Sequence, residues 1–162
     1  MVPVTLGRWR PHTTGILVGG LVLVLVALVA LYMLNNFRPT TDVKISASVF
    51  KARLATTESE RAQGLSGVEK LGANEALLMV YDSDSKWGIW MNNMKIPLDI
   101  VWLDSDKEVV YIVTDASPEL GTTKTFKPKD AARYVLELPA GTVKKSAIKI
   151  GDEAAFTLKD KQ

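Results

Sequence analysis

Cysteine is absent from the 162-residue sequence, and histidine occurs once, at His12. Without cysteine the chain forms no disulfide bond, no thiolate zinc or iron–sulfur site, and offers no cysteine nucleophile. Since the one histidine lies near the N-terminus, the rest of the chain has none for a metal site or a Ser-His-Asp triad. We therefore expect no cofactor, and enzyme classes that depend on these side chains are excluded.

Composition is close to the globular average, with 47% hydrophobic and 23% charged residues. These fractions exclude a wholly disordered chain and a protein with many membrane spans. At roughly 100 to 200 residues per domain, the length allows one ordinary domain and an appendage.

One long uncharged run, ILVGGLVLVLVALVALYML, extends from Ile16 to Leu34. At about 1.5 Å per residue, a helix of this length nearly matches the roughly 30 Å hydrocarbon core of a bilayer. We therefore predict a tail at residues 1–15, a transmembrane helix at 16–34, a short polar linker at 35–42 and one domain at 43–162. A cleaved signal peptide is the alternative, but this run is longer than such segments and is followed by large residues.

The expected direction of insertion depends on Arg8 and Arg10 before the run and on Arg38 and Lys44 after it. Positive residues favour the cytoplasmic side, and large domains are translocated largely regardless of their charge. We therefore expect a signal anchor in a single-pass membrane protein, with a cytoplasmic N-terminus and an extracytoplasmic C-terminal domain. The membrane is then the first expected partner.

The predicted domain has no net charge, because residues 43–162 contain 17 lysines and arginines and 17 acidic residues. Nucleic-acid-binding surfaces neutralise phosphates with an excess of basic residues, so we expect no nucleic-acid partner. The charge is unevenly placed, since acids dominate from Glu69 to Glu119 and bases from Leu120 to Lys149. These segments form either two complementary solvated faces or a basic binding edge.

Short apolar or alternating segments recur through this domain, as is typical of β-strands. We predict strands at residues 43–50, 51–55, 77–81, 88–91, 99–103, 109–114, 133–138 and 153–158. The turn sequence at 104–107 predicts that the strands on either side of it pair as a hairpin.

Helical signals in the domain are few and short. A capping box at residues 57–60 opens a helix that Gly64 ends, and residues 141–147 allow one or two turns. The predicted fold class is mainly β, a β-rich α+β fold. We expect one compact antiparallel barrel-like or sandwich domain with one or two short helices.

The most unusual stretch is WGIWMNNMKIPLD, from Trp87 to Asp99. An aromatic side chain beside amides, a cation and a carboxylate is typical of binding sites in which the aromatic ring stacks on an apolar face of the ligand. The polar side chains then hydrogen-bond to the polar groups of the ligand. The candidate ligand-binding residues are Trp90, Asn92, Asn93, Lys95 and Asp99. The alternative is structural, with tryptophan and methionine on strand faces, asparagines in a turn and Pro97 at a strand start.

Motifs in a fixed order resemble those of the domain of unknown function 192 family. They are Gly64-Leu65, LLMVY, IWMNNMKIPLDIVWLD, YVLELPAG and Ile150-Gly151-Asp152. The resemblance, from about Val49 to Leu158, implies a compact barrel-like β domain, often with an N-terminal secretory or membrane segment. It implies no activity, because the family is uncharacterised.

The central motif departs from the family pattern at three positions. Asn92 stands where the family has lysine, Met94 where it has threonine, and Ser66 where it has methionine. If the family lysine and threonine contact a ligand, this chain has altered that contact or has replaced it with Lys95.

Two acidic residues of these motifs, Asp99 and Glu137, are weak catalytic candidates. Asp99 begins a strand, where its carboxylate can instead accept backbone N–H groups from a neighbouring turn. Glu137 lies in YVLEL on the face of Val135, opposite Leu136. If the two carboxyl groups converge on one groove, they could act as general acid and base on a glycosidic bond. The Asp-Ser-Asp sequences at 82–84 and 104–106 lack the rest of a calcium loop, so we expect no metal site.

Three functions remain open at this point. The leading interpretation is a membrane-tethered extracytoplasmic module, without enzymatic activity, that binds an unknown envelope ligand or a protein partner. The alternative is a carboxylate-based hydrolase or lyase that acts on an envelope polymer through Asp99 and Glu137. The third is a purely structural membrane-tethered scaffold, whose motif glycines and proline serve turn geometry alone.

Overall fold

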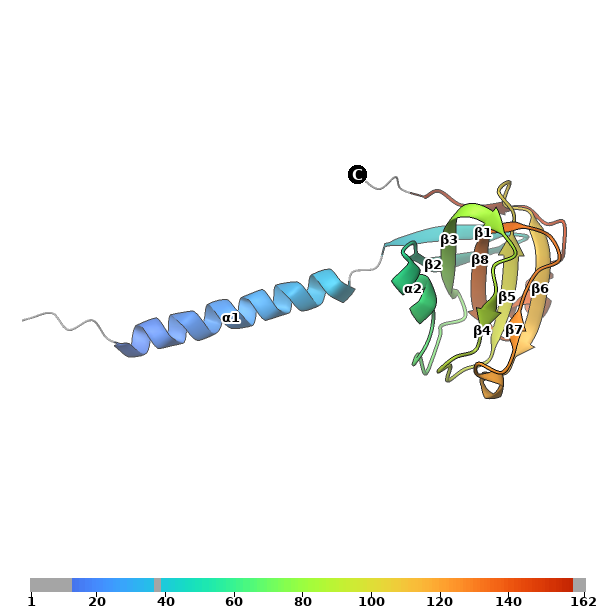
Figure 1. Cartoon of the computed structure of the whole chain (residues 1–162). Coiled ribbons are helices and arrows are strands. Elements are labelled where there is room, and N and C mark those ends of the chain that lie inside the picture. Colours follow the sequence, from blue (N-terminus) through green and yellow to red (C-terminus); the bar gives the residue numbers. More distant parts are fainter. Residues whose placement is uncertain (1–12, 37–38, 159–162) are drawn as a thin grey trace, which may run out of the picture. The chain divides into compact units, whose positions relative to one another are not determined.

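The computed structural model describes residues 13–36 and 39–158, with side chains described at 19–31 and from residue 39 onward. The chain divides into two units, Met1–Arg38 and Pro39–Gln162. The first contains helix α1 (Thr13–Asn36), and the second contains every strand of the described residues (Figure 1).

Helix α1 has the helical conformation predicted for residues 16–34 and is longer at both ends. Its described side chains, from Gly19 to Leu31, are uncharged and exposed. Within the described residues no helix is long and apolar enough to cross a membrane, so the structure does not support the predicted transmembrane span. The residues that set its expected direction, Arg8, Arg10 and Arg38, lie outside the described residues.

A curled 7-stranded sheet forms the framework of the second unit, in the order β6–β5–β8–β3–β2–β1–β9. Its strands are β1 (Thr40–Ile45), β2 (Ser48–Ala55), β3 (Glu75–Ser85), β5 (Leu98–Leu103), β6 (Val109–Ala116), β8 (Ala132–Pro139) and β9 (Ala154–Ala155). Neighbouring strands are antiparallel except β2 and β3, which are parallel. The prediction of a mainly β, largely antiparallel domain is confirmed, and Figure 1 shows the sheet as a half-barrel.

Hydrogen bonds join the two edges of this sheet at one end. Glu108, just before β6, forms a bridge with Glu153, just before β9. The backbone N–H of Ala154 donates to the carbonyl of Lys107 at 2.9 Å. These contacts hold the sheet in its curled form.

The core lies on both faces of the sheet. One face packs Val43, Phe50, Leu78, Val101, Leu136 and their neighbours against α3 (Thr142–Lys145) and β9. The other face is covered by the paired short strands β4 (Ile89–Trp90) and β7 (Thr125–Phe126), with α2 (Glu58–Gln63) and η1 (Pro118–Leu120). Because strand β5 is covered on both faces, all 6 of its residues are buried.

Several local predictions are confirmed. In the capping box, the Thr57 hydroxyl accepts the N–H of Glu60, and the Glu60 carboxylate accepts the N–H of Thr57 at 3.0 Å. Strands β5 and β6 pair across the predicted turn, where the Asp104 carboxylate accepts the N–H groups of Asp106 and Glu108. Short-range hydrogen bonds of this kind can be predicted from the sequence because the two partners lie within a few residues of each other.

Two predicted boundaries are wrong. Residues 43–50 are not one strand, because Ser46 has a φ of 50° and turns the chain between β1 and β2. Strand β1 begins at Thr40, so the predicted linker at 35–42 includes the first residues of the sheet.

Candidate functional site

Asp99 lies in the core of the domain. Its side chain is fully buried, and its two carboxylate oxygens accept the backbone N–H of Asp115 at 2.9 Å and of Val143 at 2.8 Å. These bonds attach the end of β6 and the start of α3 to β5. These hydrogen bonds are the ones expected from the structural alternative to catalysis or ligand binding.

Asp99 and Glu137 lie on opposite faces of the sheet. In the pairing of β5 with β8, Asp99 lies opposite Leu138, and Ile100 lies opposite Glu137. Directly opposed residues share a face, whereas successive residues of a strand alternate. The two carboxyl groups do not converge, so the mechanism that required both of them has no geometric basis here.

Asn92, Asn93 and Lys95 belong to the turn between β4 and β5. Asn93 has a φ of 54°, a left-handed conformation that asparagine tolerates. The carbonyl of Asn92 accepts the Ser66 hydroxyl at 2.8 Å, and that of Asn93 accepts the N–H of Gly67 at 2.9 Å. The backbone of this turn thus fixes the segment that follows α2, while the side chains of Asn93 and Lys95 are exposed.

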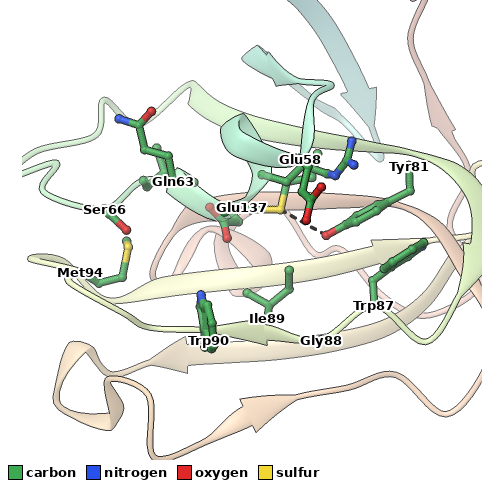
Figure 2. A pocket seen from close by; sticks show the side chains of 15 residues that line it. Glu58, Gln63, Ser66, Tyr81, Trp87, Gly88, Ile89, Trp90, Met94 and Glu137 are labelled. Atoms are coloured by element: carbon green, nitrogen blue, oxygen red, sulfur yellow. Dashed lines mark hydrogen bonds between the residues drawn. The ribbon is translucent and has the colours of Figure 1, made fainter.

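Trp90 borders a pocket of about 370 Å³ (Figure 2). Its side chain is 50% exposed, an uncommon state for tryptophan. The pocket is lined by α2 and the segment after it, by β3, by β4 and the loops on either side of β4, and by one residue of β8. Its lining includes the side chains of Glu58, Arg61, Ser66, Met79, Tyr81, Trp87, Ile89, Trp90, Met94 and Glu137.

Glu137 is the buried acidic residue of this pocket. It projects from β8 on the face of Val135, as predicted, and is 4% exposed. Its Oε2 atom has no hydrogen-bond partner among the described residues. Burial raises the pKa of Glu137 to about 7, and the Arg53 guanidinium opposes that shift. This carboxyl group therefore changes charge near neutral pH.

Gly64 leaves space beside that carboxyl group. The residue ends α2 with a φ of 52°, and its N–H donates to the carbonyl of Glu60 at 2.9 Å. A Cβ atom at this position would lie 3.8 Å from Glu137 Oε2 and 3.4 Å from the Met79 terminal methyl carbon. The glycine thus permits the turn, and a methyl group at this position would make ordinary van der Waals contact with the buried Oε2 atom.

Tyr81 and Trp87 form an aromatic wall. Their rings stack with centroids 4.1 Å apart and an interplanar angle of 10°. The Tyr81 hydroxyl donates to the Met79 sulfur at 3.7 Å, and burial raises the pKa of Tyr81 to about 12. The Trp87 indole N–H donates to the carbonyl of Ser83 at 3.2 Å, and its own carbonyl accepts the indole N–H of Trp102 at 2.9 Å. The wall is therefore fixed and uncharged.

Arg61 is the one basic residue among the described residues that line the pocket. Its Nη1 donates to the carbonyls of Thr56 at 2.7 Å and Val80 at 2.8 Å. Its guanidinium carbon lies 4.7 Å from the centroid of the Tyr81 ring. These contacts hold the cation against the aromatic wall.

Sequence reasoning placed Trp90 and Glu137 among the candidates but did not bring them together, and it missed Arg61 and Tyr81. The available signals were an acidic residue inside an apolar strand and a Gly-Leu pair ending a helix. Within the described residues, no three acidic or histidine side chains lie close enough to hold a metal ion. The arrangement offers one buried proton-accepting oxygen and an apolar, largely aromatic lining.

The sequence comparisons agree with the family resemblance. Residues 40–156 match the model of the DUF192 family, described as uncharacterized ACR. A UPF0127 protein of Thermococcus kodakarensis is 33% identical over 109 residues, which cover 66% of this chain and 65% of that protein. A UPF0127 protein of Thermococcus gammatolerans is 31% identical over 111 residues, 67% of this chain and 68% of that protein. The match thus spans about two thirds of the length of these relatives.

Two crystal structures share the fold. One, from Sinorhizobium meliloti and provisionally assigned as a transcription regulator, has a TM-score of 0.70 and 27% identity, covering 74% of this chain and 95% of that one. Another, a protein of unknown function from Novosphingobium aromaticivorans, has a TM-score of 0.68 and 28% identity, covering 72% and 84%. The chain belongs to the DUF192 family, whose curated relatives are uncharacterised UPF0127 proteins.

Proposed function

We propose that this protein is a membrane-tethered module whose pocket beside Glu137 binds a small organic ligand. One observation carries the proposal: Glu137 lines the pocket, and its Oε2 atom is buried and lacks a hydrogen-bond partner among the described residues. A buried polar atom left unsatisfied costs about 1 to 3 kcal/mol. A ligand that donates an N–H or O–H group to this oxygen removes that cost.

The dimensions and lining of the pocket support the same proposal. Its volume, about 370 Å³, lies in the range of roughly 300 to 1,000 Å³ that is usual for small-molecule sites. Such sites combine an apolar lining with a few polar groups that fix the orientation of the ligand. Here Trp87, Trp90 and Ile89 supply the apolar part and Glu137 the polar part.

The membrane anchor of this proposal is inferred from the sequence. The run from Ile16 to Leu34 carries no charged residue, and Arg8 and Arg10 before it favour a cytoplasmic N-terminus. The domain then lies outside the cytoplasm and meets ligands of the cell envelope. The test is alkaline carbonate extraction of membranes: the chain is expected in the pellet and a Leu25→Arg variant in the supernatant. Protease added to intact cells should digest the domain, and its full protection would reverse the direction.

The binding site is tested with the full-length chain in non-ionic detergent. A thermal-shift screen would cover envelope glycans, peptides, organic amines and nucleotides. A ligand at 100 times its dissociation constant stabilises the folded state by about 2.7 kcal/mol, which is readily measured. We expect the shift produced by a hit to fall in Trp90→Ala and Glu137→Gln and to persist in Lys95→Ala. A shift that persists in Trp90→Ala and Glu137→Gln but falls in Lys95→Ala would place the site at the exposed turn. That result would refute the proposal that the ligand binds in the pocket.

A second candidate function is proton-transfer catalysis by Glu137. A general acid or base works best with a pKa near the working pH, and burial brings the pKa of this group to about 7. A hit that is chemically converted, with turnover lost in Glu137→Gln, would favour this candidate. A hit recovered unchanged favours the binding module.

A further inference from the structure

We propose that the ligand of this pocket is an organic amine in its ammonium form, with its N–H groups on Glu137 and its hydrocarbon part against the aromatic wall. This inference rests on the proposed function and names the class of ligand. Four groups decide it: the unpaired carboxyl oxygen, the neighbouring cations, the aromatic wall and the second acid of the pocket.

Two arginines, Arg53 and Arg61, lie near Glu137. Arg61 donates through Nη1 to two backbone carbonyls, and Arg53 donates through Nη2 to the carbonyl of Gly64 at 3.4 Å. Neither supplies a hydrogen bond to Glu137 Oε2, which has no partner among the described residues. A buried carboxylate needs both an opposite charge and hydrogen-bond donors, and an ammonium group provides both.

The aromatic wall of the pocket already contacts a cation. Tyr81 is stacked on Trp87 and lies under the Arg61 guanidinium, whose central carbon is 4.7 Å from the ring centroid. The two faces of the Tyr81 ring are thus occupied by Trp87 and Arg61, and the pocket holds one cation against an aromatic ring. Trp90, half exposed at the same pocket, offers a further ring to a ligand.

The other polar residues of the lining favour an amine over an anion or a sugar. Glu58 is a second acidic residue in the lining. A carboxylate or phosphate ligand would therefore lie near two acidic residues and one arginine, Arg61, which already donates to two backbone carbonyls. A sugar needs many polar partners, yet the Ser66 hydroxyl already donates to the carbonyl of Asn92 and the Tyr81 hydroxyl to the Met79 sulfur. An ammonium group on a hydrocarbon body needs one anionic acceptor and apolar walls, which is what these residues provide.

Binding of an ammonium group depends on the charge of Glu137. The charged and titratable groups around it are Arg53 from β2, Glu58 and Arg61 from α2, and Tyr81 from β3. Since the pKa of Glu137 is about 7, its ionised fraction falls about tenfold from pH 8 to pH 6. The affinity for an amine should fall by a similar factor over this range.

The experiment titrates the full-length chain in non-ionic detergent at pH 8, with tryptophan fluorescence as the readout. The probes are 2-phenylethylamine, the neutral 2-phenylethanol and N-acetylglucosamine. We expect the amine to bind at least about tenfold more tightly than the alcohol, a difference of about 1.4 kcal/mol. That preference should be lost in Glu137→Gln and retained in Glu153→Gln, which removes an exposed acid at the β9 edge. Trp90→Ala, at a half-exposed position, should weaken the amine without unfolding the domain.

Each outcome decides between the two proposals. Equal binding of the amine and the alcohol, or amine binding that is unchanged in Glu137→Gln and at pH 6, overturns the ammonium inference. Preferential binding of the sugar through Glu137 also overturns it, while the pocket remains the ligand site. Failure of every probe here and of every ligand in the thermal-shift screen overturns both.

Discussion

Replacing Glu137 with glutamine removes a titrating group from the core and so changes how stability depends on pH. In the folded protein, burial raises the pKa of Glu137 to about 7, whereas the unfolded chain has a value near 4.3. Between these values the folded state holds a proton that the unfolded state has released. The free energy of unfolding contributed by this group is therefore greatest below about pH 4 and is lost as the pH rises through 7.

The magnitude follows from the same two values. Between pH 5 and pH 8, proton linkage at one such group lowers the free energy of unfolding by roughly 2 to 3 kcal/mol. Glu137→Gln has no such linkage, so the difference in stability between the two proteins should change by that amount. The change in the free energy of unfolding caused by the substitution is therefore expected to be more favourable at pH 8 than at pH 5. Contributions of other titrating groups, such as Asp152, are common to both proteins and cancel.

The assay is urea unfolding of both full-length proteins in non-ionic detergent at several pH values, followed by tryptophan fluorescence. Glu153→Gln is the matched control and should differ from the parent protein by a constant amount across the same range. A difference between parent and Glu137→Gln that is also constant from pH 5 to pH 8 would refute the reasoning. It would mean that the carboxyl group is hydrated or paired in solution.

The remaining predictions concern stability and the turn. Asp99→Ala leaves two buried backbone N–H groups without an acceptor and should lower the free energy of unfolding by about 2 to 5 kcal/mol in urea; a loss below about 1 kcal/mol would contradict its structural role. Thr57→Ala removes the cap of α2 and should cost about 1 kcal/mol in the same measurement, unless the helix end is already frayed. Asn93→Gly keeps the positive φ and should leave both stability and ligand binding nearly unchanged, whereas a loss of binding would assign a ligand contact to its side chain.

The parts of the fold that could be predicted depend on short-range chemistry. The capping box of Thr57 and the hairpin across residues 104–107 form within a few residues, and both are found. The split of residues 43–50 into two strands was missed because the sequence around Ser46 lacks the glycine or asparagine that usually signals a left-handed turn. The parallel pairing of β2 with β3 depends on a long connection through α2, whose direction no local pattern specifies.

The candidate site was only partly predictable for the same reason. Alternation within YVLEL placed Glu137 on the face of Val135, but strand pairing brings that face to Arg53 and Met79. Arg53 pairs with Leu77, and Leu77 pairs with Glu137, in a row across β2, β3 and β8. No residue near Glu137 in the sequence indicates these neighbours. The position of Trp90, which borders the pocket from β4, is likewise not indicated by the residues around it.

The two acids singled out by the family motifs differ in how well the fold satisfies them, and this difference bears on the scaffold interpretation. Asp99 is buried with both oxygens hydrogen-bonded, as expected of a residue whose role is structural. Glu137 is also buried, but its Oε2 atom has no hydrogen-bond partner among the described residues. A scaffold would be more stable with an apolar residue or an amide at this position, because either avoids desolvating a carboxylate. Glu137 is therefore the residue that a purely structural function leaves unexplained, and a ligand-binding function accounts for it.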